Sequence, residues 1–480
     1  MKKYLFILTI FLPLIYTSCF EEQLNETGKL AFSTDTVMFD TIFSQVGSVT
    51  KRFRIYNPNN QEVVISSISL AKGTDSEFRL NIDGEATNHA RNIRVRGKDS
   101  LFIFVEVTIN PGGGNSPMVV EDSIICNTNG HRQDVNLLAW GQDVHLYIAR
   151  TLKTQTWTND KPYLIYFNVL VDSLETLTIE KGTRVHFHKN ASMVVKGNLV
   201  VKGTLDEPVI FQGDRLDDLF PGFPYDDVPG QWGAIAFLDG SKGNEMNYAI
   251  VKNATAGLQL GEHNKFNPPD LTLKNTIIQN SSFAGIFSFG GSIAAHNSII
   301  ANSGQYNLFL SRGGHVEFYH CTFANYWKNF SNRSTPSVYI SNYYYSKYYD
   351  VEKEDTVEEY FEQDLEKSYF GNSIIYGNLK NELLFDDTSG VRFSPEFDYC
   401  LLKVPENYEK PEKVLFQETI TEVADSLFIN PDEFDYQLDT LTEAQDAGDI
   451  SIARKYPTDY NGNSRLSDKG PDLGAYERIE

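Results

Sequence analysis

The sequence predicts an all-β protein in which an antiparallel β-sandwich is followed by a stack of short parallel strands. Two observations lead to this fold class. Residues 28–145 contain alternating apolar strands that are separated by clusters of turn-forming residues. Residues 163–400 repeat one short strand template, whose closing Asn recurs at steps of 27, 22 and 23 residues.

The chain opens with a leader that is typical of exported proteins. Lys2 and Lys3 precede an apolar run from Leu5 to Ile15, which is too short to span a bilayer with soluble flanks. The small residues Thr17 and Ser18 follow it. We therefore expect residues 1–18 to be a signal peptide.

Cys19 directly follows these small residues and resembles the lipidated cysteine of the lipobox in bacterial lipoproteins. Tyr16 stands where Leu is usual, which is typical of the looser lipoboxes of the Bacteroidetes. The resemblance implies that Cys19 carries the acyl chains of a membrane anchor, with residues 19–27 as a tether. Glu21 and Glu22 resemble the acidic tract that sends such lipoproteins to the outer face of the outer membrane. We expect a lipid-anchored outer-membrane protein; an ordinary signal peptide is the alternative.

The composition limits the expected partners. The formal net charge is −22 and the isoelectric point is about 4.9. Nucleic acids and anionic lipid surfaces both require clustered Lys and Arg, so neither is an expected partner. Cys126, Cys321 and Cys400 allow at most one disulfide, so the fold must depend on its apolar core.

Residues 28–145 have the strand and turn spacing of a β-sandwich. Strands such as Phe53–Tyr56 and Leu101–Val107 alternate with turns such as Asn57–Asn60 and Pro111–Gly114. The order of these features resembles the immunoglobulin-like domains of the Hydin and choice-of-anchor type. That resemblance implies a spacer or binding module, and residues 146–162 are expected to form a linker after it.

Five segments in the second half share a short β-branched strand bounded by Asn or Gly. They are Tyr248–Asn253, Asn275–Asn280, Asn297–Asn302, His320–Asn325 and Asn372–Gly377. Strands of about four residues that recur once per period are expected to pair in parallel as the rungs of a solenoid. The Asn that closes each of the first four segments is then expected to cap backbone groups in a ladder of turn amides.

The stretches Leu177–Leu199 and Gly230–Ile235 resemble the right-handed parallel β-helix proteins of the pectate-lyase-like superfamily. The tail from Asp446 to Glu477 is similar to the ending of many exported β-helix proteins. The resemblance implies a β-helix over 163–400 and a C-terminal β-helix end and tail over 401–480. It is specific for the fold and not for a reaction.

The last two rungs are 52 residues apart, from Asn325 to Gly377. This distance fits either two turns or one turn with an excursion, and we favour one turn with an excursion near residues 343–369. Val351–Ser368 is rich in Glu, Asp and Lys, which interrupts the strand pattern and predicts a helix projecting from the stack.

An acidic loop is the first candidate ligand-binding site, because aromatic rings beside carboxylates suit sugars, with Ca²⁺ as a conceivable cofactor. A solvated insertion loop is the alternative. No other metal or cofactor is predicted. The candidate residues are Asp214, Asp217, Asp218, Asp226, Asp227 and Trp232.

A run of tyrosines is the second candidate. Tyr343, Tyr344 and Tyr345 belong to six tyrosines within eleven residues, more than one coil can bury. Tyr combines a flat apolar face with a hydroxyl, which suits carbohydrate or protein partners. The alternative is that these rings cover the root of the excursion.

These observations predict a non-catalytic lipoprotein of the cell envelope, whose β-helix surface binds a polysaccharide or a surface protein. The alternative is a polysaccharide lyase or a glycoside hydrolase, which needs acids stacked on adjacent coils. The facing positions of the repeats are Asn, Ser, Thr, Ala and Ile instead. No catalytic residue is therefore assigned. Three or more acids that converge with a Lys or Arg within about 6 Å in a groove would favour the enzyme.

Overall fold

The computed structural model describes residues 24–114, 117–220, 222–261, 269–328, 330–350, 355–422 and 426–479. The chain divides into two compact units, and the boundary lies between Asp143 and Val144. The predicted signal peptide and Cys19 lie outside the described residues. Among the described residues, no helix has the length and apolar character that a membrane span requires.

The N-terminal unit is a sandwich of two five-stranded sheets, in which β2 pairs with β10 in parallel and the other pairs are antiparallel. Alternate side chains of the strands, such as Ile103 and Val105, are buried in one core that both sheets share. A 3-10 turn, η2 (Gly73–Asp75), follows β4. One sheet contains, in order, β1 (Ala31–Phe32), β3 (Lys51–Tyr56), β8 (Ser100–Val107), β5 (Phe78–Ile82) and β6 (Glu85–Ala86). The other contains β2 (Thr36–Phe43), β10 (His131–Gln142), β9 (Met118–Thr128), β4 (Val63–Leu70) and β7 (His89–Val95).

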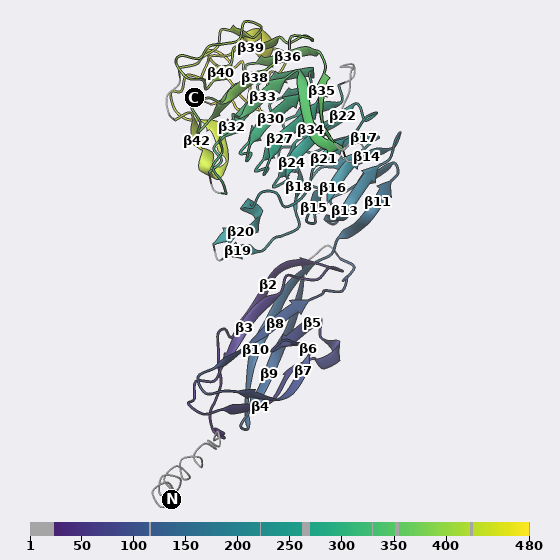
Figure 1. Ribbon diagram of the computed structural model, residues 1–480, viewed down its shortest axis with the longest axis vertical. Coiled ribbons are helices and arrows are strands. Elements are labelled where there is room, and N and C mark those ends of the chain that lie inside the picture. The colour runs from purple at the N-terminus through teal and green to yellow at the C-terminus, as the bar shows by residue number, and fades with distance from the viewer. Residues whose placement is uncertain are drawn as a thin grey trace, which may run out of the picture. The chain divides into compact units, whose positions relative to one another are not determined.

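The unit from Val144 onward is a parallel β-helix (Figure 1), and its strands stack in three columns. The first column contains β15 (Arg184–Phe187), β18 (Val209–Gly213), β23 (Ala249–Lys252), β26 (Ile277–Gln279), β29 (Ile299–Ala301), β32 (Thr322–Asn325), β37 (Ile374–Gly377) and β40 (Leu401–Leu402). The second contains β16 (Ser192–Val195), β21 (Ile235–Phe237), β24 (Ala256–Leu260), β27 (Ala284–Phe289), β30 (Tyr306–Ser311), β33 (Val338–Ser341) and β38 (Leu383–Asp386). The third contains β12 (Gln155–Trp157), β14 (Thr176–Glu180), β17 (Asn198–Lys202), β22 (Asn244–Asn247), β25 (Leu271–Lys274), β28 (Ser292–His296), β31 (Gly314–Tyr319), β36 (Leu365–Gly371), β39 (Pro395–Asp398) and β41 (Leu415–Gln417). The predicted fold class is confirmed.

Every second side chain of a strand points into the β-helix, and these inward side chains form one apolar core. Like residues stack on one another from coil to coil, as the rings of Phe318, Phe370 and Phe397 do, with centroids 5.1 and 4.7 Å apart. At the corner between the first and second columns, Asn253 and Asn280 take positive φ angles of 66° and 57°. Asn tolerates this left-handed conformation better than most residues, which explains its recurrence at 253, 280 and 302, where φ is positive.

The repeated segments form the first column in the predicted parallel register. Ile250 pairs with Ile277, and Ile277 pairs with Ile299. Thr322 pairs directly with Ile374, so the chain between them makes a single turn. The prediction of one turn with an excursion is therefore confirmed.

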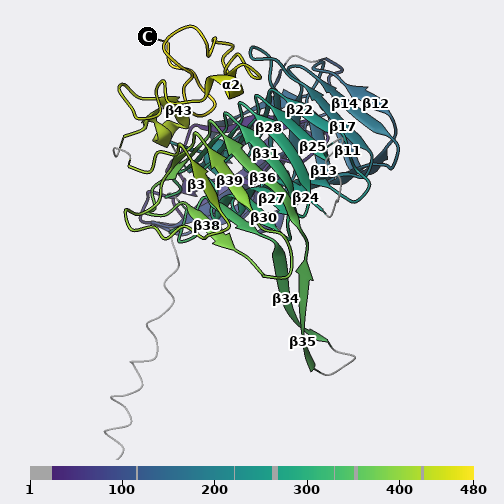
Figure 2. The same ribbon diagram turned by 90° about the horizontal axis from the view of Figure 1, so that it is seen from above.

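The predicted helix in this excursion is wrong. The structure has an antiparallel hairpin there, formed by β34 (Tyr343–Asp350) and β35 (Asp355–Glu362), which projects from the stack (Figure 2). The charged residues suggested a helix, but the stretch also contains aromatic and β-branched residues, Thr356, Val357, Tyr360 and Phe361, which favour a strand. Cross-strand aromatic pairs such as Tyr345 with Tyr360, 4.9 Å apart, stabilise the hairpin instead.

The predicted linker over 146–162 is also wrong. β11 (His145–Leu152) pairs in parallel with β13 (Tyr163–Val171), and both strands run through the first two columns. β12 pairs with β14 in the third column. These residues therefore form the first coil, and their short, interrupted apolar pattern concealed them in the sequence.

The C-terminal tail covers the outer side of the first column. Outward residues of the column, such as Ile374 and Tyr376, share a second apolar core with tail residues such as Phe428 and Leu473. The tail contains β42 (Phe428–Asn430), η4 (Pro431–Glu433), β43 (Asp435–Leu438) and α2 (Ile450–Ala453). From β29 to β40 the first column is thus buried on both of its faces, as is usual for parallel strands.

Candidate functional site

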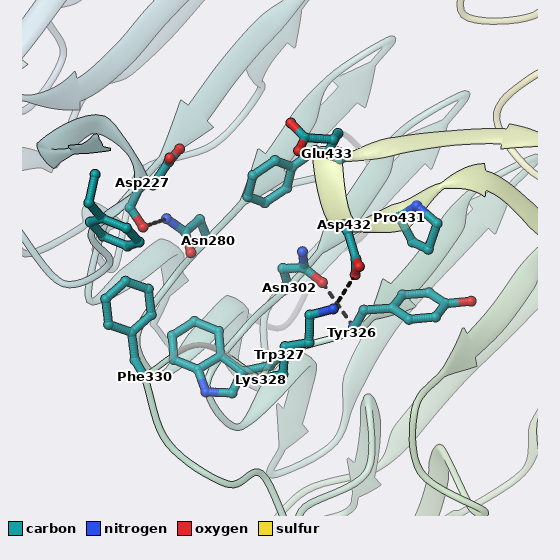
Figure 3. Close-up of a pocket in the computed structure, with 12 residues that line it drawn as sticks. Asp227, Asn280, Asn302, Tyr326, Trp327, Lys328, Phe330, Pro431, Asp432 and Glu433 are labelled. Carbon is teal, nitrogen blue, oxygen red and sulfur yellow. Dashed lines mark hydrogen bonds and ion pairs between the residues drawn. The ribbon is translucent and has the colours of Figure 1, made fainter. Parts of the chain in front are cut away.

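A groove opens at the corner between the first and second columns (Figure 3), with a cavity of about 240 Å³. Three segments far apart in sequence form its walls: the acidic loop after β18, the loop after β32, and η4 of the tail. Two side chains of the Asn ladder lie between them. The lining residues are Phe223, Asp227, Asn280, Asn302, Tyr326, Trp327, Lys328, Phe330, Pro431, Asp432, Glu433 and Phe434.

The Asn ladder holds two of these walls in place. The Asn280 Nδ2 donates to the Asn253 Oδ1 at 2.8 Å and to the backbone oxygen of Asp227 at 2.9 Å. On the other side, the Asn302 Oδ1 accepts a hydrogen bond from the backbone N–H of Tyr326 at 2.8 Å. The ladder therefore caps backbone groups as predicted, and it fixes the loops relative to the rungs.

Aromatic rings form one wall of the groove. The ring centroid of Phe330 lies 5.9 Å from that of Phe223 and 5.9 Å from that of Trp327. The Trp327 Nε1 donates to the Ser331 Oγ at 3.1 Å, which orients the indole. Such flat apolar surfaces with nearby polar groups are typical of ligand sites.

A buried ion pair fixes the loop that carries these rings. The Arg333 guanidinium and the Glu382 carboxylate form two hydrogen bonds of 2.7 Å, and both side chains are almost fully buried. Arg333 also donates to the backbone oxygen of Asn325 at 2.9 Å. A bidentate pair of this kind is geometrically specific, so the aromatic wall is preorganised.

The opposite wall is acidic. The Asp432 carboxylate pairs with the Lys328 ammonium at 2.6 Å, and Glu433 stands next to it. Burial raises the pKa of Asp227, and the negative charges of Asp226 and Glu433 raise it further. The groove thus places aromatic ring faces and negatively charged carboxylate groups around one cavity.

Of the five predicted acids, Asp227 lines this groove. The others lie elsewhere in a loop that contains β19 (Asp218–Phe220), β20 (Phe223–Pro224) and η3 (Tyr225–Asp227). Asp214 accepts from the His188 Nδ1 at 2.7 Å, and Asp226 pairs with Lys252 at 2.6 Å.

The remaining two acids do not gather around a common centre. Asp217 pairs with both the Nε and Nη2 of Arg215 at 2.6 Å, and Asp218 is exposed on β19. Among the described residues, no three His, Cys, Asp or Glu side chains are grouped as a metal site requires.

Trp232 is not a ligand-binding residue. Its side chain is completely buried and stacks on Phe187 with ring centroids 4.1 Å apart. Its Nε1 donates to the backbone oxygen of Lys252 at 2.9 Å. The proximity of Trp232 to the acidic loop in sequence was misleading, because it is the first inward residue of the next coil.

The three candidate tyrosines lie on the hairpin and do not line the groove. The Tyr343 hydroxyl donates to the Asp386 Oδ2 at 2.9 Å, which covers the root of the hairpin. Tyr344 packs edge-on against Phe289 at 5.0 Å, and Tyr345 is 38% exposed. The hairpin tyrosines therefore serve partly as cover and partly as exposed surface.

Most residues of the groove were not predicted from the sequence. Tyr326, Trp327 and Phe330 follow directly after the Asn that closes the fourth repeat, so a cluster of rings at a known coil corner was the available signal. Asp432 and Glu433 come from the tail, about a hundred residues later. No local pattern indicates that the tail returns to this corner.

No family model matches the chain, and no curated protein matches it. Among solved structures, a PapD-like domain of human CEP192 is similar at 10% identity with a TM-score of 0.17, over 25% of this chain and 87% of that one. The E. coli chaperone DraB is similar at 8% identity with a TM-score of 0.17, over 24% and 55% of the two chains. A family 123 glycoside hydrolase from Clostridium perfringens is similar at 7% identity with a TM-score of 0.18, over 26% and 31%.

Proposed function

We propose that this chain is a non-catalytic envelope protein that binds saccharide in the groove between the acidic loop, the loop after β32 and η4. The observation that carries the proposal is the aromatic wall of Phe223, Trp327 and Phe330 facing carboxylates across a preformed cavity. A pyranose has one apolar C–H face and a polar rim, so it fits rings on one side and hydrogen-bond acceptors on the other.

A glycan array followed by calorimetry on its best oligosaccharide tests this proposal. Phe330 is 41% exposed, so its replacement by Ala removes a ring from the groove at little cost to the fold. We expect F330A to weaken binding by about tenfold, which corresponds to about 1.4 kcal/mol. Tyr349, which is 62% exposed on the hairpin, provides the matched control, because Y349A removes an aromatic ring outside the groove. Equal losses in both variants would contradict the proposed site.

The same proposal places the protein at the outer membrane through lipid on Cys19. Support comes from the leader and the small residues before this cysteine. Mass spectrometry of the mature N-terminus should find a diacylated or triacylated cysteine, and C19A should release the protein from the membrane fraction. An unmodified thiol at the mature terminus would disprove the anchor.

Glycoside hydrolysis in the same groove is a second candidate. It is favoured by the presence of two carboxyl groups, Asp227 and Glu433, in the same groove. One protonated and one ionised carboxyl group are what such hydrolysis requires. If the groove hydrolyses its ligand, D227N will still bind the oligosaccharide but form no new reducing ends. Binding without product in the unmodified protein would exclude this candidate.

A further inference from the structure

The groove carries more negative charge than a neutral sugar requires. The carboxylates of Asp227, Asp432 and Glu433 line it together with one ammonium group, that of Lys328, which pairs with Asp432 at 2.6 Å. Two negative charges are therefore in excess. Lys252 lies near Asp227, but its charge is offset by Asp226, with which it forms a 2.6 Å ion pair.

The aromatic wall adds to this preference for a cation. Ring faces attract ammonium and guanidinium groups within about 6 Å, more strongly where water is excluded. The acidic loop already contains one such contact, since the Arg215 guanidinium lies 4.1 Å from the Tyr225 ring centroid. Phe223 and Phe330 stand beside the carboxylates in the same groove, so rings and acids favour the same charge on a ligand.

We propose that the groove selects saccharides that carry a protonated amine, such as de-N-acetylated hexosamine units, over N-acetylated and acidic ones. This inference rests on the proposed function, because it names the class of saccharide bound at that site. A uronate carboxylate would be repelled by Asp227 and Glu433. An N-acetyl group would cover these carboxylates without offering a positive charge.

The lysine side chain of a peptide carries the same ammonium group, but the shape of the groove favours a sugar. Its rings present flat faces, which match the flat C–H face of a pyranose, whereas a lysine stem is narrow and flexible. The amide ladder beside the rings adds a polar edge of fixed geometry. Tighter binding of a lysine peptide would therefore contradict the inference.

Calorimetry on the full-length chain with three tetrasaccharides tests the inference: the tetramer of glucosamine, the tetramer of N-acetylglucosamine, and tetragalacturonate. At about pH 6 and low salt, where the amine is charged and screening is weak, we expect the glucosamine tetramer to bind at least about tenfold more tightly than the N-acetylated one. E433Q should remove most of this preference, because it removes a negative charge that attracts the amine of the glucosamine tetramer. Glu433 is exposed on η4, so the variant will fold.

D227N should have the same effect, and D218N is the matched control because Asp218 is exposed in the same loop but does not line the groove. Equal affinity for the two hexosamine tetramers would overturn the inference and leave saccharide binding intact. If the chain binds none of the three tetrasaccharides and no glycan of the array, both this inference and the proposed saccharide binding are wrong. Tetralysine that binds more tightly than the glucosamine tetramer, with the same dependence on Glu433, would assign the groove to a peptide.

Discussion

The C-terminal tail meets the β-helix in two places, and the two contacts differ in burial. Over the first column, the tail buries Arg465 against the carboxyl group of Glu477 at 3.1 Å, and the two side chains are 0% and 2% exposed. Beside the groove, the tail forms the ion pair of Asp432 with Lys328, whose side chains are 57% and 55% exposed. We call the buried contact of Arg465 with Glu477 the sealed contact, and the exposed ion pair of Asp432 with Lys328 the open contact.

The sealed contact is satisfied by many partners. The Arg465 Nη2 donates to the Asn297 Oδ1 at 3.1 Å and to the backbone oxygens of Gly474 and Ala475 at 3.0 Å. The open contact leaves its charges accessible to solvent and to a ligand. Burial therefore decides which of the two contacts holds the fold and which one is available for recognition.

The largest expected effect comes from breaking the sealed contact. R465M leaves the Glu477 carboxyl group and several buried oxygens without their donor, and we expect it to lower the free energy of unfolding by about 3–5 kcal/mol. Urea denaturation followed by tryptophan fluorescence measures this loss. K328M breaks the open contact and should change stability by no more than about 0.5 kcal/mol. Similar losses in the two variants would contradict the comparison.

The second effect is a pH dependence that belongs to the sealed contact alone. Burial, assisted by Asp472, raises the pKa of Glu477 to about 8 from an ordinary value of 4.5. The folded state therefore keeps a proton that the unfolded state has lost between these values. The stabilisation that this proton contributes is complete below about pH 4.5. It declines between pH 4.5 and 8 and is lost above 8.

Denaturation from about pH 7.5 to 9 tests this effect. Below this range His296 and His320, whose pKa values burial lowers, would take up protons on unfolding and oppose it. We expect a decline of about 1 kcal/mol per pH unit that levels off above pH 8.5. E477Q imitates the protonated side chain and should flatten the profile. A profile that rises with pH in the unmodified chain would refute the assigned direction.

The sequence predicted what depends on local pattern. The repeat template located the first column, because a β-branched rung ending in a left-handed Asn is visible in a few residues. The same local view misplaced Trp232 and assigned a helix to 351–368, where the charged residues outweighed the aromatic and β-branched ones. The groove depends on the tail returning to one coil corner, and that long-range contact has no signature near Trp327 or Asp432.

The smallest expected effect concerns the hairpin, which belongs to neither contact of the tail. The backbone N–H of Gln363 donates to the backbone oxygen of Asn342 at 3.0 Å, so the two ends of the hairpin already lie together. Replacing residues 343–362 with a two-residue turn should therefore keep the pairing of β31 with β36. We expect an unchanged unfolding midpoint, apart from a small loss where Tyr343 covers Asp386.

The same deletion variant also separates the two candidate surfaces. Its affinity for the best oligosaccharide should equal that of the full chain, because the hairpin residues do not line the groove. A loss of binding as large as that of F330A, with the unfolding midpoint retained, would move the saccharide site to the hairpin tyrosines. Retained affinity would instead assign recognition to the open wall beside η4, since removing Tyr344 and Tyr345 leaves every groove residue in place.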